Sequence, residues 1–145
     1  MDRECTSRRH FLGLGVAAAA ASACGGCSLV GSRKADAVAQ EDQNVLRLGQ
    51  ADSAALLGSE ASLLVEPEGG GGKIMVVNRG GLFAVSSACT HMGCDVKYDK
   101  KVGHLLCPCH GSQYGLDGAN IKGPAKEPLK RYDVRSENGR VVIAL

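Results

Sequence analysis

Cysteine and histidine residues gather in two short segments of this sequence. The segments are CTHMGC at residues 89–94 and CPCHGSQY at residues 107–114, and they hold four of the chain's 7 cysteines and two of its 4 histidines. Thiolates and imidazoles are the side chains that bind soft and borderline metals most strongly. Two such segments on neighbouring loops therefore predict one shared metal centre.

The spacing C-x-H, fifteen intervening residues and C-x-x-H selects Cys89, His91, Cys107 and His110 as ligands. A structural zinc site also takes two thiolates and two imidazoles, but zinc modules usually open with paired cysteines and close with paired histidines. A disulfide framework of four cysteines is typical of small exported domains, and it leaves both histidines without a role. A two-iron cluster with two thiolates on one iron and two imidazoles on the other uses the whole mixed set.

The two segments resemble the cluster-binding loops of Rieske iron-sulfur proteins, in the high-potential form used by quinol-oxidising cytochrome bc complexes. The resemblance covers roughly residues 45–145. It implies one 2Fe-2S cluster as the cofactor. The implied ligands are Cys89 and Cys107 on the inner iron and His91 and His110 on the outer iron.

The resemblance also implies roles for residues around the ligands. It pairs Cys94 with Cys109 in a disulfide that holds the two loops together. Ser112 and Tyr114 stand where high-potential members place hydroxyls that hydrogen-bond to a bridging sulfide and to the first cysteine ligand, here Cys89. Because donors aimed at the sulfurs favour the reduced state, these two hydroxyls predict a high reduction potential.

Three further positions lie near the motifs. Met92 stands where a bulky apolar side chain, often Leu, shields the cluster from water, and a flexible thioether fills such a site easily. Residues 123–128, GPAKEP, resemble the proline-containing loop that covers the cluster, with Lys126 where a second proline is common. His104 lies outside both motifs and is expected at the surface or on a strand.

The implied function is electron transfer as the iron-sulfur subunit of a bc-type quinol:cytochrome c (or plastocyanin) oxidoreductase, rather than a stand-alone enzyme. Its implied partners are quinol, cytochrome b and a c-type cytochrome. Because taking an electron also favours taking a proton, His91 or His110 is expected to accept the proton of a bound quinol, and the resemblance favours His110. Two alternatives stay open: the small Rieske subunit of an exported molybdenum oxidase such as arsenite oxidase, and an independent periplasmic Rieske electron carrier.

The first 30 residues indicate export. The sequence SRRHFL at residues 7–12 resembles a twin-arginine signal, which predicts a protein at the periplasmic face of the bacterial inner membrane. Residues 11–30 carry no charge and would form a helix of about 30 Å, long enough to be retained as a membrane anchor. Residues 21–23, ASA, resemble a cleavage site, and Cys24 could then carry a lipid. An anchored, a lipid-tethered and a soluble mature form stay open.

Short segments rich in branched side chains predict the strands that must position the metal centre. They lie at residues 45–48, 62–66, 73–78, 82–86, 129–134 and 140–145. A helix is expected at residues 52–58, with Asp52 or Ser53 as its N-cap. Residues 31–44 are polar and without periodicity, so they predict a flexible linker.

These segments predict an all-β domain of Rieske-type stacked antiparallel sheets at residues 45–145, preceded by an N-terminal hydrophobic signal or anchor helix at residues 1–30. Residues 88 to about 123 are expected to form a loop-rich cluster-binding subdomain. The formal net charge is +2, and positive and negative side chains alternate without a long basic run. The sequence therefore predicts no nucleic-acid partner.

Overall fold

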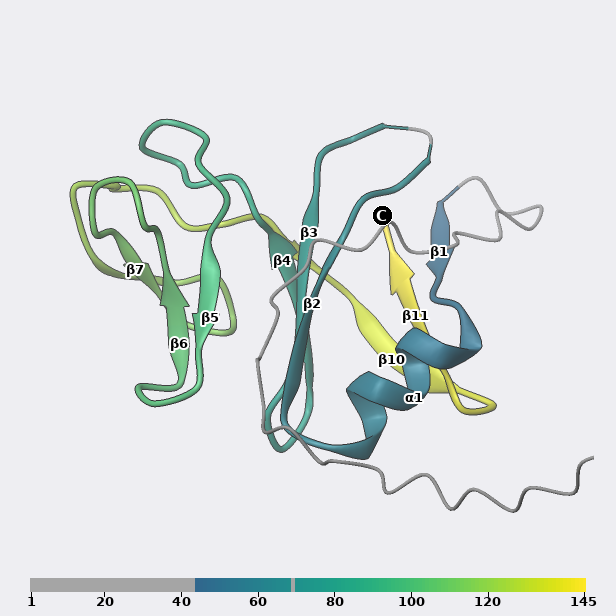
Figure 1. Ribbon diagram of the computed structural model, residues 1–145. Coiled ribbons are helices and arrows are strands. Elements are labelled where there is room, and N and C mark those ends of the chain that lie inside the picture. The colour runs from purple at the N-terminus through teal and green to yellow at the C-terminus, as the bar shows by residue number, and fades with distance from the viewer. Residues whose placement is uncertain (1–43, 69) are drawn as a thin grey trace, which may run out of the picture.

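A computed structural model describes residues 44–68 and 70–145. The signal or anchor expected at residues 1–30, and all but the last residue of the linker expected at residues 31–44, lie outside this part of the chain. The described part holds three antiparallel sheets and one helix (Figure 1). Within it, no helix has the length and apolar character needed to cross a membrane.

The sheets lie side by side, with the β5–β8 sheet at one end of the molecule (Figure 1). The first sheet has the order β1 (Val45–Arg47), β11 (Arg140–Ala144), β10 (Val134–Glu137). The second has the order β2 (Ala61–Val65), β3 (Ile74–Asn78), β4 (Leu82–Ser86), β9 (Arg131–Tyr132). The third has the order β5 (Lys97–Asp99), β6 (His104–Leu106), β7 (Gln113–Tyr114), β8 (Asn120–Lys122).

The middle sheet is buried on both faces. Alternate residues of a strand point to opposite faces, so Ile74 and Val76 of β3 enter one hydrophobic core while Met75 and Val77 enter another. All four side chains are at most 4% exposed. Many antiparallel sheets expose one face to water, and their strands then alternate apolar and polar residues. Burial on both faces explains why β3 instead carries the unbroken apolar run IMVV.

The second of these cores contains residues of the predicted metal centre. It joins the β2–β3–β4–β9 sheet to the β5–β8 sheet. Its buried members are Met75, Val77, Val85, Cys89, Val96, Leu105, Cys107, Tyr114, Ala125 and Leu129. Burying each large apolar side chain contributes about 1.5–3 kcal/mol, so the packing that joins these two sheets also fixes the start of both cysteine-containing loops.

Helix α1 (Gln50–Gly58) confirms the helix expected near residues 52–58, but the expected side-chain cap is wrong. Gly49 occupies the N-cap position, and no side chain caps the helix. Ser53 is fully buried instead. Its Oγ donates to the Leu48 carbonyl (3.3 Å) and accepts the Val141 N–H (3.1 Å). The hydroxyl therefore ties the helix to the first sheet rather than to its own N-terminus.

Two strand expectations change in the structure. The segment expected as one strand at residues 129–134 divides at Asp133 into β9 and β10, which belong to different sheets. Asp133 accepts a hydrogen bond from the Ala144 N–H (2.8 Å), so the chain turns into the first sheet at this residue. The segment expected as loop-rich, residues 88 to about 123, contains the whole β5–β8 sheet between its loops.

Candidate metal centre

Residues 89–94, called loop 1, form a tight turn between β4 and β5. The Cys89 N–H donates to the Cys94 carbonyl (2.9 Å), and the Gly93 N–H donates to the Cys89 carbonyl (2.7 Å). Gly93 has φ of 76°, a left-handed conformation that strains any residue with a Cβ. The turn therefore needs its glycine four residues after the cysteine.

Residues 107–112, called loop 2, repeat the same turn between β6 and β7. The Cys107 N–H donates to the Ser112 carbonyl (2.8 Å), the Gly111 N–H donates to the Cys107 carbonyl (3.0 Å), and Gly111 also has φ of 76°. Each loop thus begins at a cysteine and has a left-handed glycine four residues later. A hydrogen bond from the cysteine N–H to the carbonyl of the fifth residue closes the turn. The two potential thiolate ligands occupy the same position in equivalent turns.

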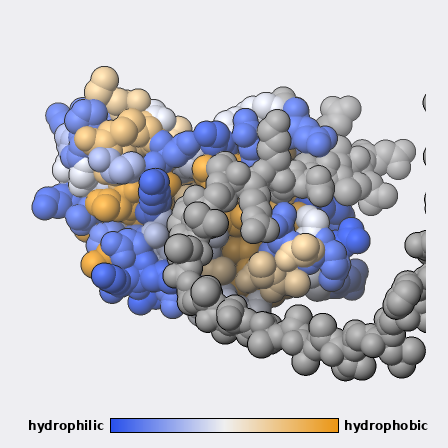
Figure 2. Space-filling view, viewed as in Figure 1, coloured by the Kyte–Doolittle hydropathy of each residue, from blue (hydrophilic) through white to orange (hydrophobic). Residues whose placement is uncertain are grey.

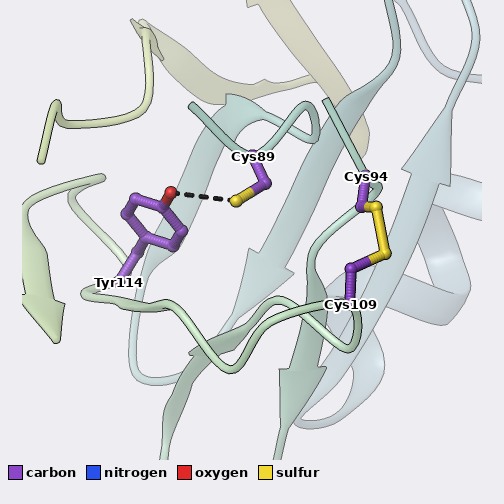
Figure 3. The surroundings of a disulfide bond; sticks show 4 residues. All are labelled: Cys89, Cys94, Cys109 and Tyr114. Atoms are coloured by element: carbon purple, nitrogen blue, oxygen red, sulfur yellow. Dashed lines mark hydrogen bonds between the residues drawn. A yellow bond between two sulfur atoms is a disulfide. The ribbon is translucent and has the colours of Figure 1, made fainter. Parts of the chain in front are cut away.

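A disulfide joins the two loops, as the resemblance implied (Figure 3). Cys94 and Cys109 form it, with an S–S distance of 2.05 Å and a Cα–Cα distance of 6.5 Å. Among residues 44–68 and 70–145, the cysteines left free are Cys89 and Cys107. The alternative of two disulfides built from these four cysteines is therefore wrong, because two thiols remain free to bind a metal.

The remaining potential ligands form a set with a buried and an exposed side. Cys89 is 3% exposed and Cys107 is 1% exposed, whereas His91 and His110 lie at the surface. The two imidazole ring centroids are 4.8 Å apart, with an angle of 82° between the ring planes. Two buried thiols and two exposed, adjacent imidazoles are the donors that a 2Fe-2S cluster with mixed ligation requires. The residues present therefore fit such a cluster.

The disulfide lies directly against one of these thiols. The Sγ atoms of Cys94, Cys107 and Cys109 are all within 4.8 Å of one another. This trio does not form a separate metal site, because the two disulfide sulfurs offer no thiolate. The disulfide instead lies next to the Cys107 thiol, so the covalent link between the loops supports the site at this residue.

The surroundings make the two thiols unequal. Burial alone would raise the pKa of Cys89, but hydrogen bonds from the Tyr114 hydroxyl, the His91 amide, the Cys107 thiol and the Ser112 hydroxyl outweigh it and hold this pKa below its ordinary value. Burial raises the pKa of Cys107, and its contact with Cys89 raises it further. Cys89 is therefore the thiol that the protein stabilises more strongly as an anion.

The segment at residues 123–128 is fastened to both loops. The Ala125 N–H donates to the Ser112 Oγ (3.1 Å), and the Thr90 Oγ1 donates to the Glu127 carbonyl (2.8 Å). Ser112 is fully buried, so this bond is shielded from water. Thr90 had not been singled out from the sequence, because its partner lies 37 positions away and carries no motif of its own.

The outer surface of the site is mixed in polarity. Figure 2 shows apolar residues within a mostly hydrophilic surface on the part of the molecule formed by the β5–β8 sheet. Met92 is 69% exposed, so it is not packed as ordinary core. Lys126 is exposed as well. His104 is the first residue of β6 and pairs in register with Asp99 of β5.

Comparison with known proteins agrees with this geometry. Residues 37–133 match the family described as the Rieske [2Fe-2S] domain. The cytochrome b6-f complex iron-sulfur subunit of Chlorobaculum tepidum is 49% identical over 74 residues, which are 50% of this chain and 41% of that protein. The chloroplastic cytochrome b6-f complex iron-sulfur subunit of Pisum sativum is 44% identical over 62 residues, 41% of this chain and 27% of that protein. The aligned part thus spans less than half of these relatives.

A solved structure resembles the described domain over nearly the whole length of that solved chain. It is the cyanobacterial plasma membrane Rieske protein PetC3 from Synechocystis PCC 6803, with a TM-score of 0.56 and 29% sequence identity. The alignment covers 68% of this chain and 98% of that one. With the family match extending over residues 37–133 and both cluster loops present, the chain belongs to the Rieske [2Fe-2S] domain family.

Proposed function

We propose that this chain is the electron-transfer subunit of a bc-type quinol oxidoreductase. In this proposal Cys89 and Cys107 bind the inner iron of the cluster, and His91 and His110 bind the outer iron. The single observation that carries the proposal is that the two loops together present two free buried thiols and two exposed imidazoles whose ring centroids are 4.8 Å apart. A shielded inner half and a solvent-facing outer half suit a site that exchanges electrons with partners at its surface.

The protein's own residues would act on the proton and on the potential. When bound, a Rieske cluster supplies one-electron chemistry at about −150 to +300 mV. The exposed imidazole of His110 would accept a hydrogen bond from a quinol hydroxyl at the ring nitrogen that does not bind iron, and it would take the proton while the bound cluster takes the electron. His91 completes the exposed pair. The Tyr114 hydroxyl, 3.2 Å from the Cys89 Sγ, stabilises negative charge at that sulfur.

The proposed partners follow from the named relatives. Both curated relatives described above are subunits of cytochrome b6-f complexes, which supports a membrane complex containing cytochrome b and a c-type cytochrome. Neither is a subunit of a molybdenum enzyme, so the comparisons give that alternative no support. Sedimentation of the solubilised membranes would test the partnership: the chain should migrate with b-type and c-type haem, whereas migration alone would favour the independent carrier.

The proposed location is the periplasmic face of the inner membrane, reached by the twin-arginine route. The SRRHFL sequence at residues 7–12 supports it. Replacing both Arg8 and Arg9 by Lys should leave the unprocessed chain in the cytoplasm. A separate variant, Cys24→Ala, tests the tether: loss of membrane association would identify a lipid on Cys24. Export of the double Lys variant at the normal rate would contradict the proposed route.

The decisive experiment is a series of redox titrations of the full chain at increasing pH, with electron paramagnetic resonance of the reduced protein. A rhombic signal of low average g-value would identify mixed ligation, and a potential that falls with rising pH in the alkaline range would support proton uptake by the imidazoles. His104→Gln is the matched control, since this histidine lies outside both loops, and it should leave the pH dependence unchanged. A potential independent of pH would reject the quinol chemistry.

A further inference from the structure

The carboxylate of Asp95, which is not one of the proposed metal ligands, is held in place directly beside loop 1. Asp95 follows the disulfide residue Cys94, and an isolated antiparallel bridge pairs it with Ala88. Its carboxylate accepts a hydrogen bond from the Ser87 Oγ (2.6 Å) and another from the Lys73 Nζ (2.7 Å). A charged pair therefore lies at the base of the loop that holds two of the four proposed ligands.

The pair is built into the sheet rather than lying loosely on the surface. Ser87 is fully buried, its N–H donates to the Lys73 carbonyl (2.9 Å), and its carbonyl accepts the Val96 N–H (2.8 Å). Lys73 and Asp95 are thus held through the same serine by backbone and side-chain bonds. Their side chains are each 37% exposed, which leaves their charges only partly screened by water.

Both groups are charged at neutral pH. Burial alone would raise the pKa of Asp95, but hydrogen bonds from Lys73 and Ser87 and the charge of Lys73 outweigh it and hold this pKa below its ordinary value. The hydrogen bond to Asp95 and its charge raise the pKa of Lys73, and Glu66 adds to the effect. The cluster would therefore experience a negative and a positive charge whose fields largely cancel.

We propose that Lys73 and Asp95 are positioning residues of the cluster site that fix loop 1 and set the reduction potential as an opposed charge pair. The inference rests on the proposed binding of the cluster by loops 1 and 2. Reduction adds one negative charge to the site. A carboxylate beside loop 1 disfavours that step and an ammonium favours it, so each residue alone would shift the potential and the pair holds it between the two extremes.

The test uses two substitutions that remove the same ion pair and have opposite electrostatic effects. Asp95→Asn keeps the shape of the side chain and leaves Lys73 unpaired, so the potential of the full-length holoprotein should rise. Lys73→Met keeps the apolar stem and leaves Asp95 unpaired, so the potential should fall. The double variant should lie between the two single variants, and both single shifts should decrease when the ionic strength is raised.

A purely structural role predicts a different outcome. If the pair only anchors loop 1, the two single variants lose the same contact and shift the potential in the same direction or not at all; either result overturns the proposal. Lys73→Arg should retain the wild-type potential, because the positive charge is kept. If Asp95→Asn does not load the cluster, the salt dependence of Lys73→Met decides alone. A potential that is lowered at low ionic strength and returns toward the wild-type value as the ionic strength is raised supports the proposal, and an unchanged potential or a shift that is independent of ionic strength overturns it.

The chain offers a matched control pair far from the loops. Arg135 and Glu137 form an ion pair on β10, in the sheet that contributes no residue to the second core, and Arg47 also pairs with Glu137. Arg135→Met and Glu137→Gln should leave the potential unchanged. The absence of a rhombic Rieske signal in the wild-type protein would refute the proposed ligand set, whereas a normal wild-type signal with no opposed shifts would refute only the role of Lys73 and Asp95.

Discussion

The Tyr114 hydroxyl donates to the Cys89 sulfur when that sulfur is a thiolate, because a thiolate has no proton of its own to donate. The two atoms are 3.2 Å apart, and the same hydroxyl lies 3.0 Å from the Thr90 Oγ1. The Thr90 Oγ1 uses its only proton on the Glu127 carbonyl, and the Thr90 N–H donates to the Tyr114 oxygen (3.3 Å). The phenol proton has two acceptors within reach, the Thr90 Oγ1 and the Cys89 sulfur, and a charged sulfur attracts it more strongly. The Thr90 N–H holds the phenol oxygen in place.

Replacing Tyr114 by Phe should lower the reduction potential by about 60 mV. The change removes a hydrogen bond to a charged sulfur, and this bond is stronger in the reduced state because reduction adds negative charge. A difference of about 1.4 kcal/mol between the two states corresponds to this shift for a one-electron couple. Protein-film voltammetry measures it. Tyr132→Phe is the control, because Tyr132 belongs to the other core, and it should leave the potential unchanged. An unchanged or higher potential in Tyr114→Phe would contradict the assigned donor.

Removing the cluster should expose the disulfide to exchange with Cys107. The Cys107 thiolate would attack the Cys94 sulfur, the Cys94–Cys109 bond would break as the Cys94–Cys107 bond forms, and Cys109 would leave as a thiolate without net oxidation. Alkylation and peptide mapping of chelator-treated protein should find Cys109 modified.

The controls for this exchange are the two single thiol variants. Cys107→Ser should preserve the original disulfide after cluster removal, whereas Cys89→Ser should not prevent exchange, because the Cys89 sulfur is not part of the close trio. Detection of only the Cys94–Cys109 bond in the cluster-free wild-type protein would show that the three sulfurs cannot align for attack.

Asp95 should contribute to stability at neutral pH and lose this contribution in acid. Its pKa in the folded protein lies below the ordinary value of 3.8, so the stabilisation is present above that value and disappears as the pH falls through it toward the folded pKa. The stability difference between wild type and Asp95→Asn should be up to about 1 kcal/mol near neutrality, given the partial exposure of the pair. Thermal unfolding at several pH values measures this difference, and a constant difference down to acid pH would oppose it.

Gly118→Ala should destabilise the domain more than Gly139→Ala. Both glycines have left-handed φ angles, 85° and 74°, which cost an alanine about 1–2 kcal/mol. At Gly118 an added Cβ would also lie 2.7 Å from the Leu129 carbonyl oxygen, whereas at Gly139 it would meet open space. Since the Leu129 N–H donates to the Gly118 carbonyl, the clash strains this contact as well. Equal melting temperatures for the two variants would disprove this effect.

The sequence was sufficient for the strands with strong apolar character. The expected ranges at residues 73–78, 82–86 and 140–145 agree with β3, β4 and β11 to within a residue, because unbroken runs of branched side chains mark strands that are well buried. The β5–β8 strands were missed. They are two or three residues long and mix lysine, histidine, glutamine and asparagine with apolar residues, so no periodicity can develop before each turn.

The residues of the site could likewise be predicted only where their signal is local in the sequence. Cysteine and histidine spacing is local, and it selected the two thiols and the two imidazoles as possible ligands, whereas the disulfide pairing was implied by the family resemblance. Thr90, Lys73 and Asp95 carry no such signal, because their partners lie 37 and 22 positions away and become neighbours only through sheet pairing. Residues that support a metal centre across strands therefore need the structure to find them.

The double burial of β3 has a mechanical consequence. Ile74 and Val76 pack into the first core, and Met75 and Val77 pack into the second. Because both faces of β3 are closely packed, a shift of the first or the third sheet against the middle sheet would disrupt a core. The core beneath the cysteine-containing loops and the core of the β1–β11–β10 sheet therefore share one strand as their common support. In the proposed electron-transfer subunit, a movement of His110 between two partners would then reorient both sheets around β3 together with it.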